Sequence, residues 1–339
     1  MPFVFYVILY LKISLSMRVL SQIRKPIEKE MADFENLFSS ALQHQNPILS
    51  FAMQHLLQRK GKMMRPILVL LSAKMYGEIT PEVLHAALSL ELLHTASLVH
   101  DDVVDESGTR RGQSSVNALL DNKAAVLVGD FLLSSALEHA AKTGNLRVVQ
   151  LISILGQALS DGELQQLANI DSQEINEEQY FHVIQQKTAS LFAACAEIGA
   201  ILSGASTETV ERMREVGMAI GVCFQIRDDI FDYYDDEVGK PTGNDMKEGK
   251  LTLPVIHAVL QSESSQWKSA ALKVRAGNAS EEEIKDLISY TKQVGGIEYA
   301  QQKMEEIRQG IYKRIQGQGE SDVEQSLCLY LDFVLRRVL

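Results

Sequence analysis

The feature that most constrains this chain is the rarity of residues that break helices. Only 7 prolines and 21 glycines occur among its 339 residues, and breaks this sparse favour long helices over a protein with many turns. From residue 25 onward, apolar residues recur at spacings of three and four with only short gaps, which is the pattern of packed helices. No stretch of the sequence alternates at period two. We therefore expect an all-α fold, which excludes an immunoglobulin-like sandwich or a propeller.

Helix ends can be read directly at two places in the sequence. Lys74 in a last helical turn, followed by Gly77, predicts that a helix stops there, and Thr80-Pro81 predicts the start of the next one. Ser280 with Glu283 three residues later has the pattern of a capping box at a helix start. Both signals predict boundaries between consecutive helices.

The N-terminal residues 1–16 differ from the rest of the chain. They are strongly apolar but shorter than the roughly 20 residues that a membrane span needs. A secretory signal has basic residues before its apolar run, whereas the charges here come late. We expect the natural start at Met17, because residues 17–38 have the pattern of a polar amphipathic helix. Residues 17–339 are then expected to form a single helical domain, with 1–16 as a non-native or disordered extension.

Charge and cysteine content narrow the classes of function. The chain carries 33 Lys and Arg against 44 Asp and Glu, a net charge of -11, which argues against coating a nucleic acid or an anionic membrane. The three cysteines, Cys195, Cys223 and Cys328, are widely spaced without a CxxC pattern. That is typical of reduced thiols, so we expect a cytoplasmic protein. Gly-rich nucleotide-binding loops are absent from the sequence.

Two acidic clusters interrupt the apolar pattern. Asp101 and Asp105 lie four residues apart in DDVVD. Asp228 and Asp232 repeat that spacing in DDIFD, one turn after Gln225. On a helix, this spacing puts two carboxylates on one face with about 5 to 6 Å between Cβ atoms, and at an effective dielectric constant of about 20 their repulsion costs on the order of 3 kcal/mol. One such cluster is more often solvated surface, but two that each end an apolar helix indicate a cation site.

Oxygen ligands of this kind favour a hard ion. Mg²⁺ in particular prefers a few carboxylates together with substrate phosphates. Lys62 and Arg65 stand at an expected helix start, where backbone N–H groups also favour anions. Further basic residues follow both clusters: Arg110, Arg111, Lys187, Lys240 and Lys250. Taken singly, each is more often an ordinary surface charge, but together they predict a diphosphate bound through bridging magnesium.

These residues resemble the trans-polyprenyl diphosphate synthases of medium and long chain length. The resemblance runs from about residue 25 to the C-terminus and is carried by five motifs in the order of that family. The motifs are Gly61–Pro66, His94–Gly112, Lys187-Thr188, Phe224–Asp232 and Gly239–Pro254. One departure is Lys60-Gly61-Lys62-Met63, where the family commonly has GGKR. The resemblance implies an isoprenoid-synthase fold, a single large helical bundle around a central cavity, and a homodimer.

The resemblance also implies roles for particular residues. The metal site would comprise Asp101, Asp102, Asp105, Asp228, Asp229 and Asp232. The allylic diphosphate would be bound by Arg110, Lys187, Thr188, Gln225 and Lys240. Isopentenyl diphosphate would be bound by Lys62, Arg65, His94 and Arg111. The catalytic residues would be Asp101, Asp105, Asp228 and Lys187. Without the resemblance, a lone histidine such as His94 is more often a core group, and His100 is expected to be structural.

The implied reaction is Mg²⁺-dependent, successive head-to-tail condensation of isopentenyl diphosphate onto an allylic diphosphate such as farnesyl or geranylgeranyl diphosphate. The growing chain would run along the helix before Asp101, where each turn gives about 5.4 Å of wall. Ala96 and Ser97 are small where short-chain members have bulky aromatics, and Phe131 is a candidate floor. This pattern implies octaprenyl-like products of roughly C30 to C50 along such a wall. We expect no nucleic acid partner and no transmembrane segment, although the apolar product may require membrane proximity.

Three alternatives remain open at this point. His100-Asp101 could be the doublet of an HD-type metal phosphohydrolase, which leaves the second DDxxD motif unexplained. A terpene cyclase shares the first aspartate motif, but its second metal motif differs from Asp228–Asp232. A non-catalytic helical subunit of a heteromeric prenyl synthase would be expected to lack part of its metal sites, whereas both clusters here are intact.

Overall fold

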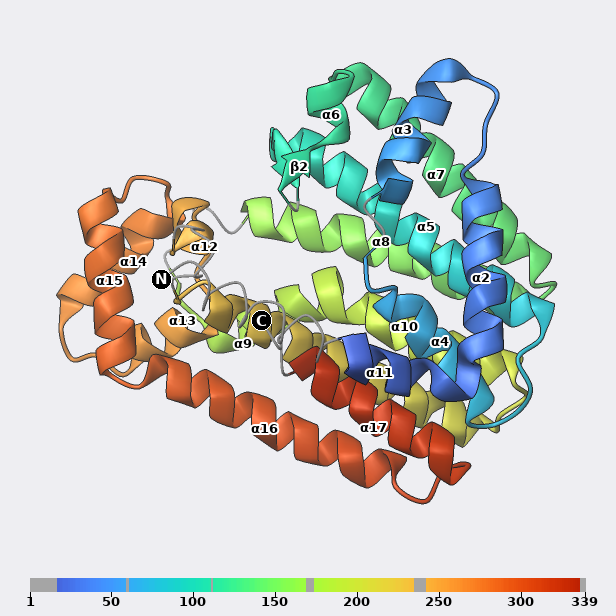
Figure 1. Ribbon diagram of the computed structural model, residues 1–339. Coiled ribbons are helices and arrows are strands. Elements are labelled where there is room, and N and C mark those ends of the chain that lie inside the picture. The colour runs from blue at the N-terminus through green and yellow to red at the C-terminus, as the bar shows by residue number, and fades with distance from the viewer. Residues whose placement is uncertain (1–16, 59–60, 111, 169–173, 235–241, 336–339) are drawn as a thin grey trace, which may run out of the picture. The chain divides into compact units, whose positions relative to one another are not determined.

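The computed structural model describes residues 17–58, 61–110, 112–168, 174–234 and 242–335. These residues are helical almost throughout (Figure 1), which confirms the all-α prediction. The strands in this part of the chain are two short ones that pair as an antiparallel ribbon, β1 (Thr109–Arg110) and β2 (Gln113–Ser114).

The chain divides into two compact units. The first unit is formed by residues up to 156, by 191–217 and by the residues from 315 onward. The second unit is formed by residues 157–190 and 218–314. The expectation of a single domain over residues 17–339 stays a prediction, and the proposed extension 1–16 lies outside the described residues.

The first unit contains most of the N-terminal half. Its elements are η1 (Lys25–Ile27), α2 (Glu28–Ala41), α3 (Pro47–Gln58), α4 (Met64–Lys74), α5 (Pro81–Val104), β1, β2, α6 (Val116–Leu119), α7 (Asn122–Lys142), the start of α8 (Leu146–Ala168), most of α10 (Ser190–Leu202), the start of α11 (Thr207–Phe231) and α17 (Ser321–Leu335). Residues 17–24 are helical, and a 3-10 turn at η1 then separates them from α2. Pro26 explains this interruption of the helix expected over 17–38, because it cannot donate a backbone hydrogen bond.

Helix α5 is the centre of the first unit. It lies beside α7, α4 and α2, and it begins at Pro81 after α4 ends at Lys74, as the sequence predicted. Ser89 on α5 donates a hydrogen bond of 2.6 Å to the carbonyl of Ala136 on α7. Near the other end, the ring of His100 occupies the space where a Cβ on Gly129 would stand, 2.2 Å from its Nε2 atom. This close packing fixes the end of α5 on which the first aspartate motif lies.

Helix α7 is the one helix within the described ranges that is long and apolar enough to cross a membrane by length and composition. Its extensive packing against α5 is that of a core helix. Val126, Leu127 and Leu137 on the same helix are exposed, so the described residues leave part of its apolar surface uncovered.

The second unit has its own apolar core. Its elements are the end of α8, α9 (Glu177–Ile184), the π-helix η3 (Gln185–Ala189), the end of α11, α12 (Asn244–Lys247), α13 (Leu253–Leu260), α14 (Ser265–Arg275), α15 (Glu281–Gln293) and most of α16 (Gly296–Ile315). Ile226 and Ile230 on α11 pack in this core together with Leu253 and Leu287. The predicted capping box at the start of α15 is confirmed, because Ser280 and Glu283 make both of its hydrogen bonds.

Candidate active site

The first aspartate motif lies at the C-terminal end of α5. The helix ends at Val104, and Asp105 caps it through a backbone hydrogen bond of 2.8 Å to the carbonyl of Asp101. Asp105 is exposed and Asp101 is half-buried, whereas Asp102 is only 3% exposed. The three carboxylates of one motif therefore stand in three different environments.

Arg110 provides the countercharge for the buried Asp102. Its Nε lies 2.6 Å from Oδ1 of Asp102. The ribbon of β1 and β2 carries Arg110, and hydrogen bonds from Ser115 to the carbonyl of Ser107 and from Asn117 to the carbonyl of Asp102 hold this ribbon against the end of α5. The sequence predicted Arg110 as a diphosphate ligand but gave no sign of this pairing, because the turn that returns the chain to α5 has no apolar periodicity.

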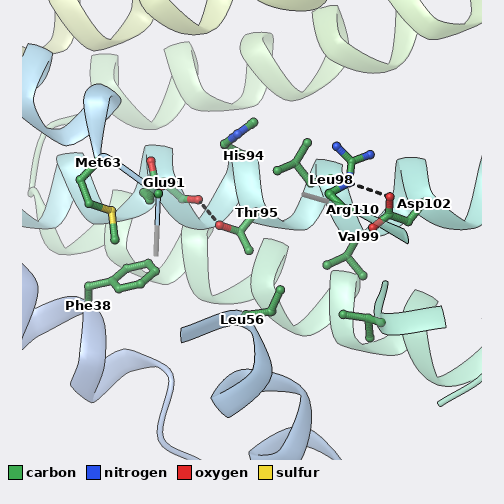
Figure 2. A pocket seen from close by; sticks show the side chains of 12 residues that line it. Phe38, Leu56, Met63, Glu91, His94, Thr95, Leu98, Val99, Asp102 and Arg110 are labelled. Carbon is green, nitrogen blue, oxygen red and sulfur yellow. Dashed lines mark hydrogen bonds and ion pairs between the residues drawn. The ribbon is translucent and has the colours of Figure 1, made fainter. Parts of the chain in front are cut away.

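A cavity runs along α5 within the first unit (Figure 2). Its empty volume, counted together with its open mouth, is about 660 Å³. Figure 2 shows Met63 and Phe38 near Glu91 at one end, and the Arg110 to Asp102 contact at the other. The lining residues are Phe38, Leu56, Gly61, Met63, Glu91, His94, Thr95, Leu98, Val99, Asp102, Arg110 and Val116. The predicted site residue His94 therefore shares one cavity with Asp102 and Arg110.

The segment before α4 enters this cavity in a strained conformation. Met63, the N-terminal cap of α4, has φ of 54°, and the other non-glycine residue with positive φ in the described ranges is Glu106, directly after the first motif. Such left-handed backbone is uncommon for non-glycine residues and gathers at functional sites. Lys62 places its Nζ 4.6 Å from the ring centroid of Phe333, and the guanidinium of Arg65 stands 5.5 Å from the ring of Phe192. Both predicted cations thus lie over aromatic rings in the first unit.

The second aspartate motif lies at the end of α11 in the second unit. Asp228 is 40% exposed by its side chain and is paired with the neighbouring Arg227. Asp229 is 3% exposed and accepts hydrogen bonds from Tyr180, 2.6 Å from Oδ2, and from Gln225, 2.8 Å from Oδ1. Burial, followed by repulsion from Asp245, raises the pKa of Asp229 to about 7.

Asp232, the last aspartate of this motif, binds the backbone at the start of α12. Its Oδ1 accepts from the backbone N–H of Asn244 at 3.0 Å and its Oδ2 accepts from that of Asp245 at 3.1 Å. Both contacts lie at the start of α12, where a carboxylate also meets the positive end of the helix. Burial raises the pKa of Asp232 and, together with repulsion from Asp232, raises that of Asp245 to about 6. Asp245 is a fourth carboxylate of this cluster that the spacing argument missed.

A π-helix positions the predicted Lys187 and Thr188. Five-residue π-helical turns are rare and are frequently found at functional sites. Lys187 forms an ion pair with Glu163 on α8, and Thr188 donates a hydrogen bond of 2.8 Å to Oε1 of Gln225. Gly162 allows this approach, because a Cβ there would already stand 3.3 Å from the backbone nitrogen of Lys187. Sequence periodicity does not distinguish a single π turn from α-helix, so this turn could not be predicted from the sequence.

Arg227 is a further charged residue that sequence reasoning missed. It is 9% exposed, and its guanidinium lies over the rings of Phe224 and Phe231 at 4.5 and 6.0 Å. The three residues stand at i, i+3 and i+7 of α11 and therefore share one face. This spacing was the signal that could have identified Arg227 as the cation beside Asp228.

The other predicted residues are distributed as follows. Ala96 is 2% exposed and Ser97 donates to the carbonyl of His94, and neither lines the cavity along α5. Phe131 packs edge-on against His44. His100 contacts the Val126 carbonyl and Asp130 on α7, a structural contact between helices. Arg111 and Lys240 lie outside the described residues.

The donor chemistry of the two motifs fits a hard divalent cation. The side-chain oxygens of both motifs are carboxylate oxygens, and at the second motif burial and neighbouring carboxylates raise the pKa of Asp229 and Asp245, an effect that a bound cation would oppose. Within the described ranges, no three His, Cys, Asp or Glu side chains already converge on one point. A cation held by one or two of these carboxylates would complete its coordination with phosphate oxygens and water.

A helical fold with two DDxxD clusters, each accompanied by cationic side chains, defines the class of metal-dependent prenyltransferases. Residues 46–291 match the sequence model of the polyprenyl synthetase family, and the chain belongs to this family. It is therefore a prenyl diphosphate synthase, and the resemblance drawn from its motifs is confirmed. The family uses divalent metal ions and has isopentenyl and allylic diphosphates as substrates.

Individual relatives agree on the family and differ in their products. The chain is 38% identical to octaprenyl diphosphate synthase of Escherichia coli (strain K12), over 73% of this chain and 76% of that protein. It is similar to the crystal structure of geranylgeranyl pyrophosphate synthase from Bacteroides thetaiotaomicron, with 46% identity, a TM-score of 0.83 and coverage of 94% and 99% of the two chains. Decaprenyl diphosphate synthase from Rhodobacter capsulatus gives 32% identity, a TM-score of 0.87 and the same coverage. These likenesses confirm the isoprenoid-synthase fold.

Proposed function

We propose that this chain is an all-trans polyprenyl diphosphate synthase that uses Mg²⁺ to condense isopentenyl diphosphate repeatedly onto an allylic diphosphate. The observation that carries the proposal is the pair of carboxylate clusters, each with a cationic group beside it: Arg110 at the first and Arg227 at the second. A hydrolase of the HD type would require the His100-Asp101 doublet, but His100 is engaged with α7.

The residues of the first unit are assigned to both substrates. Asp101 and Asp105 would hold metal ions that stabilise the charge of the leaving diphosphate. Lys62, Arg65 and His94 would bind isopentenyl diphosphate, with Arg111 completing that set. Arginine forks suit a diphosphate because they donate two parallel hydrogen bonds.

The residues of the second unit would bind and orient the allylic substrate. Asp228 would be a metal ligand, while Asp229 and Asp232 hold neighbouring groups in place. Lys187 and Gln225, together with Lys240, would donate to the allylic diphosphate, and Thr188 would orient Gln225 through its hydroxyl. These fixed donors stabilise negative charge as the C1–O bond ionises. The double bond of isopentenyl diphosphate then attacks the allylic cation, and a proton is lost to the departing diphosphate, so no side-chain nucleophile is required.

We propose octaprenyl-like products of roughly C30 to C50, because Ala96 and Ser97 on α5 are small and place no bulky ring beside the path of the growing chain, which would gain about 5.4 Å for each turn of this helix. The name of the Escherichia coli relative supports this length. The name of the Bacteroides thetaiotaomicron relative, a geranylgeranyl pyrophosphate synthase, favours a shorter product as the second candidate.

The decisive experiment incubates the purified chain with Mg²⁺, farnesyl diphosphate and labelled isopentenyl diphosphate, and sizes the dephosphorylated products. We expect a ladder of polyprenols that ends in the long-chain range, and no incorporation after chelation with EDTA. A product that stops at geranylgeranyl would select the shorter candidate. Phosphate release without carbon coupling would refute the synthase proposal altogether.

The length assignment has its own test. Ala96→Phe and Ser97→Phe would each place an aromatic ring on the wall and are expected to shift the main product to shorter chains. Ala141→Phe, at an exposed position near the end of α7, is the matched control and should leave the product unchanged. An unaltered product distribution in both wall variants would contradict the role of this wall.

We also propose a cytoplasmic homodimer. The exposed Val126, Leu127 and Leu137 on α7 support association of this helix with a second copy. Sedimentation of the purified chain at micromolar concentration should give twice the mass of 37.8 kDa, and Leu127→Glu should shift it toward the monomer.

A further inference from the structure

A chain of hydrogen bonds in the second unit connects a deeply buried tyrosine with the proposed allylic site. Tyr180 on α9 donates to Asp229, at 2.6 Å from its Oδ2. Gln225, one turn earlier on α11, donates to the other oxygen of the same carboxylate at 2.8 Å. Thr188 on the π-helix donates to the amide oxygen of Gln225, also at 2.8 Å. Three separate elements are thus joined through a single carboxylate and a single amide.

This chain of hydrogen bonds runs from a buried end to a more accessible end. Tyr180 is 8% exposed and Asp229 is 3% exposed, whereas Gln225 and Thr188 are half-buried. The buried end has little freedom, because Tyr180 packs within the apolar core of the second unit and stacks edge-on against Phe181. The accessible end carries Gln225, assigned above to the allylic diphosphate, and Thr188, which donates to its amide oxygen.

The donor and acceptor roles fix the Gln225 side chain. A carboxamide has two N–H groups and one carbonyl oxygen. Gln225 donates one N–H to Asp229, and its amide oxygen accepts from Thr188. These two contacts define which side of the amide is the donor side. The second N–H of Gln225 is left to donate to a bound anion. An amide rotated by half a turn would present its oxygen there and would repel a diphosphate.

We propose that Tyr180 is a positioning residue for the allylic site, acting through Asp229 on Gln225. The hydroxyl of Tyr180 anchors Oδ2 of Asp229, and Oδ1 of the same carboxylate then orients the amide of Gln225. Asp229 is thereby assigned to orientation of a ligand-binding side chain, and Asp228 is left as the metal-facing member of that pair. The proposal rests on the proposed function, in which Gln225 binds the allylic diphosphate.

The test compares two tyrosine-to-phenylalanine variants that each remove one hydroxyl bonded to a carboxylate. Tyr180→Phe removes the anchor of Asp229. Tyr299→Phe is the matched control, because the Tyr299 hydroxyl donates to both oxygens of Glu177 on the same helix α9, at 2.8 and 2.9 Å, and has no contact with Gln225. Both variants keep the ring and its packing, and their thermal unfolding curves measure any structural cost.

We expect Tyr180→Phe to lower kcat/KM for the allylic diphosphate about tenfold, the size of one lost hydrogen bond to a charged group. Its KM for isopentenyl diphosphate should stay at the wild-type value. Calorimetric titration with inorganic pyrophosphate in the presence of Mg²⁺ should show weaker binding by a similar factor. Tyr299→Phe should leave all three quantities unchanged. Equal kinetics in the two variants would overturn the proposal.

A double-mutant cycle with Gln225→Ala separates positioning from a general structural effect. If Tyr180 acts through Gln225, then Tyr180→Phe should cause no further loss in the Gln225→Ala background. Additive losses would overturn the proposal, because the tyrosine would then act by another route. If Gln225→Ala alone left the allylic kinetics unchanged, the assignment of the allylic site would fail and the positioning proposal with it. If Gln225→Ala impairs those kinetics and Tyr180→Phe does not, only the positioning proposal fails.

Discussion

The two aspartate motifs have the same sequence pattern and the same local geometry, yet their surroundings differ. In both motifs the last aspartate falls one residue beyond the helix, after Val104 in α5 and after Phe231 in α11. In both, the middle aspartate is 3% exposed. Asp102 meets the charged Arg110, whereas Asp229 meets the neutral Tyr180 and Gln225.

This difference shows how a buried carboxylate can be stabilised in two ways. An ion pair compensates for desolvation of both charges, so that removing one partner leaves the other uncompensated. Neutral donors satisfy the oxygens but supply no opposite charge, and burial then favours the protonated form. The pKa of Asp229, raised to about 7 by burial, is the consequence at the second motif. A shared DDxxD pattern therefore does not imply shared electrostatics.

The largest expected effect is the loss of catalysis when the first aspartate of either motif is replaced. In this respect the two motifs should behave alike. Asp101→Ala and Asp228→Ala should each reduce kcat by roughly a thousandfold or more, the scale of losing a charge-stabilising group. The free energy of unfolding should change little in Asp101→Ala and should fall somewhat in Asp228→Ala, which also removes the partner of the buried Arg227. Steady-state kinetics and urea titration measure the two quantities, and Asp286→Ala, exposed on α15, serves as control. Wild-type rates in either variant would remove that motif from the site.

The next largest effect is a pH dependence that belongs to the second motif. Asp229 ionises near 3.8 in the unfolded chain and near 7 in the folded one. Unfolding between these values releases a proton, so the free energy of unfolding should fall as the pH rises from about 4 to about 7, by at most about 1.4 kcal/mol per unit. Urea titrations of the metal-free protein measure this slope. Asp229→Asn should flatten it, and an identical slope in wild type and variant would contradict the assignment.

A matched pair of amide substitutions tests the contrast between the middle aspartates directly. Asp102→Asn removes the charge that Arg110 requires, and we expect a loss of about 2 kcal/mol in the free energy of unfolding, below the range for fully buried pairs because Arg110 is 31% exposed. Asp229→Asn leaves one of the two donors, Tyr180 or Gln225, without an acceptor but leaves no charge uncompensated, so we expect a smaller loss of about 1 kcal/mol at neutral pH. Denaturation midpoints at pH 7 measure both. Equal losses would show that the two sites are stabilised alike.

The smallest effect concerns the last aspartate of each motif. Asp232→Asn should cost about 1 kcal/mol, because its two oxygens accept backbone hydrogen bonds at the start of α12 and an amide has only one acceptor oxygen. Asp105→Asn, at an exposed helix end, should change the free energy of unfolding by less than about 0.5 kcal/mol. Thermal unfolding measures the loss of stability in both variants. A larger loss in Asp105→Asn than in Asp232→Asn would contradict the capping role of Asp232.

Much of the site was predictable because its residues lie close together in the sequence. The spacing of Asp101 and Asp105, and of Asp228 and Asp232, fixes their shared helical faces without reference to any distant contact. Other features depend on residues that are far apart in sequence. Glu163 meets Lys187, and Tyr180 meets Asp229, across 24 and 49 residues respectively, and no local pattern encodes such pairs. The predicted roles of Arg111 and Lys240 stay predictions, because both lie outside the described residues.

Local sequence patterns were enough to predict the helical class, the end of α4, the start of α5, the capping box of α15 and the two carboxylate clusters, because helix periodicity and capping are local properties of the chain. Tertiary packing sets which carboxylate of each cluster is buried, what compensates it, and which turn becomes a π-helix. These outcomes depend on desolvation and on partners brought together by packing, and neither is encoded in the spacing of residues along one helix.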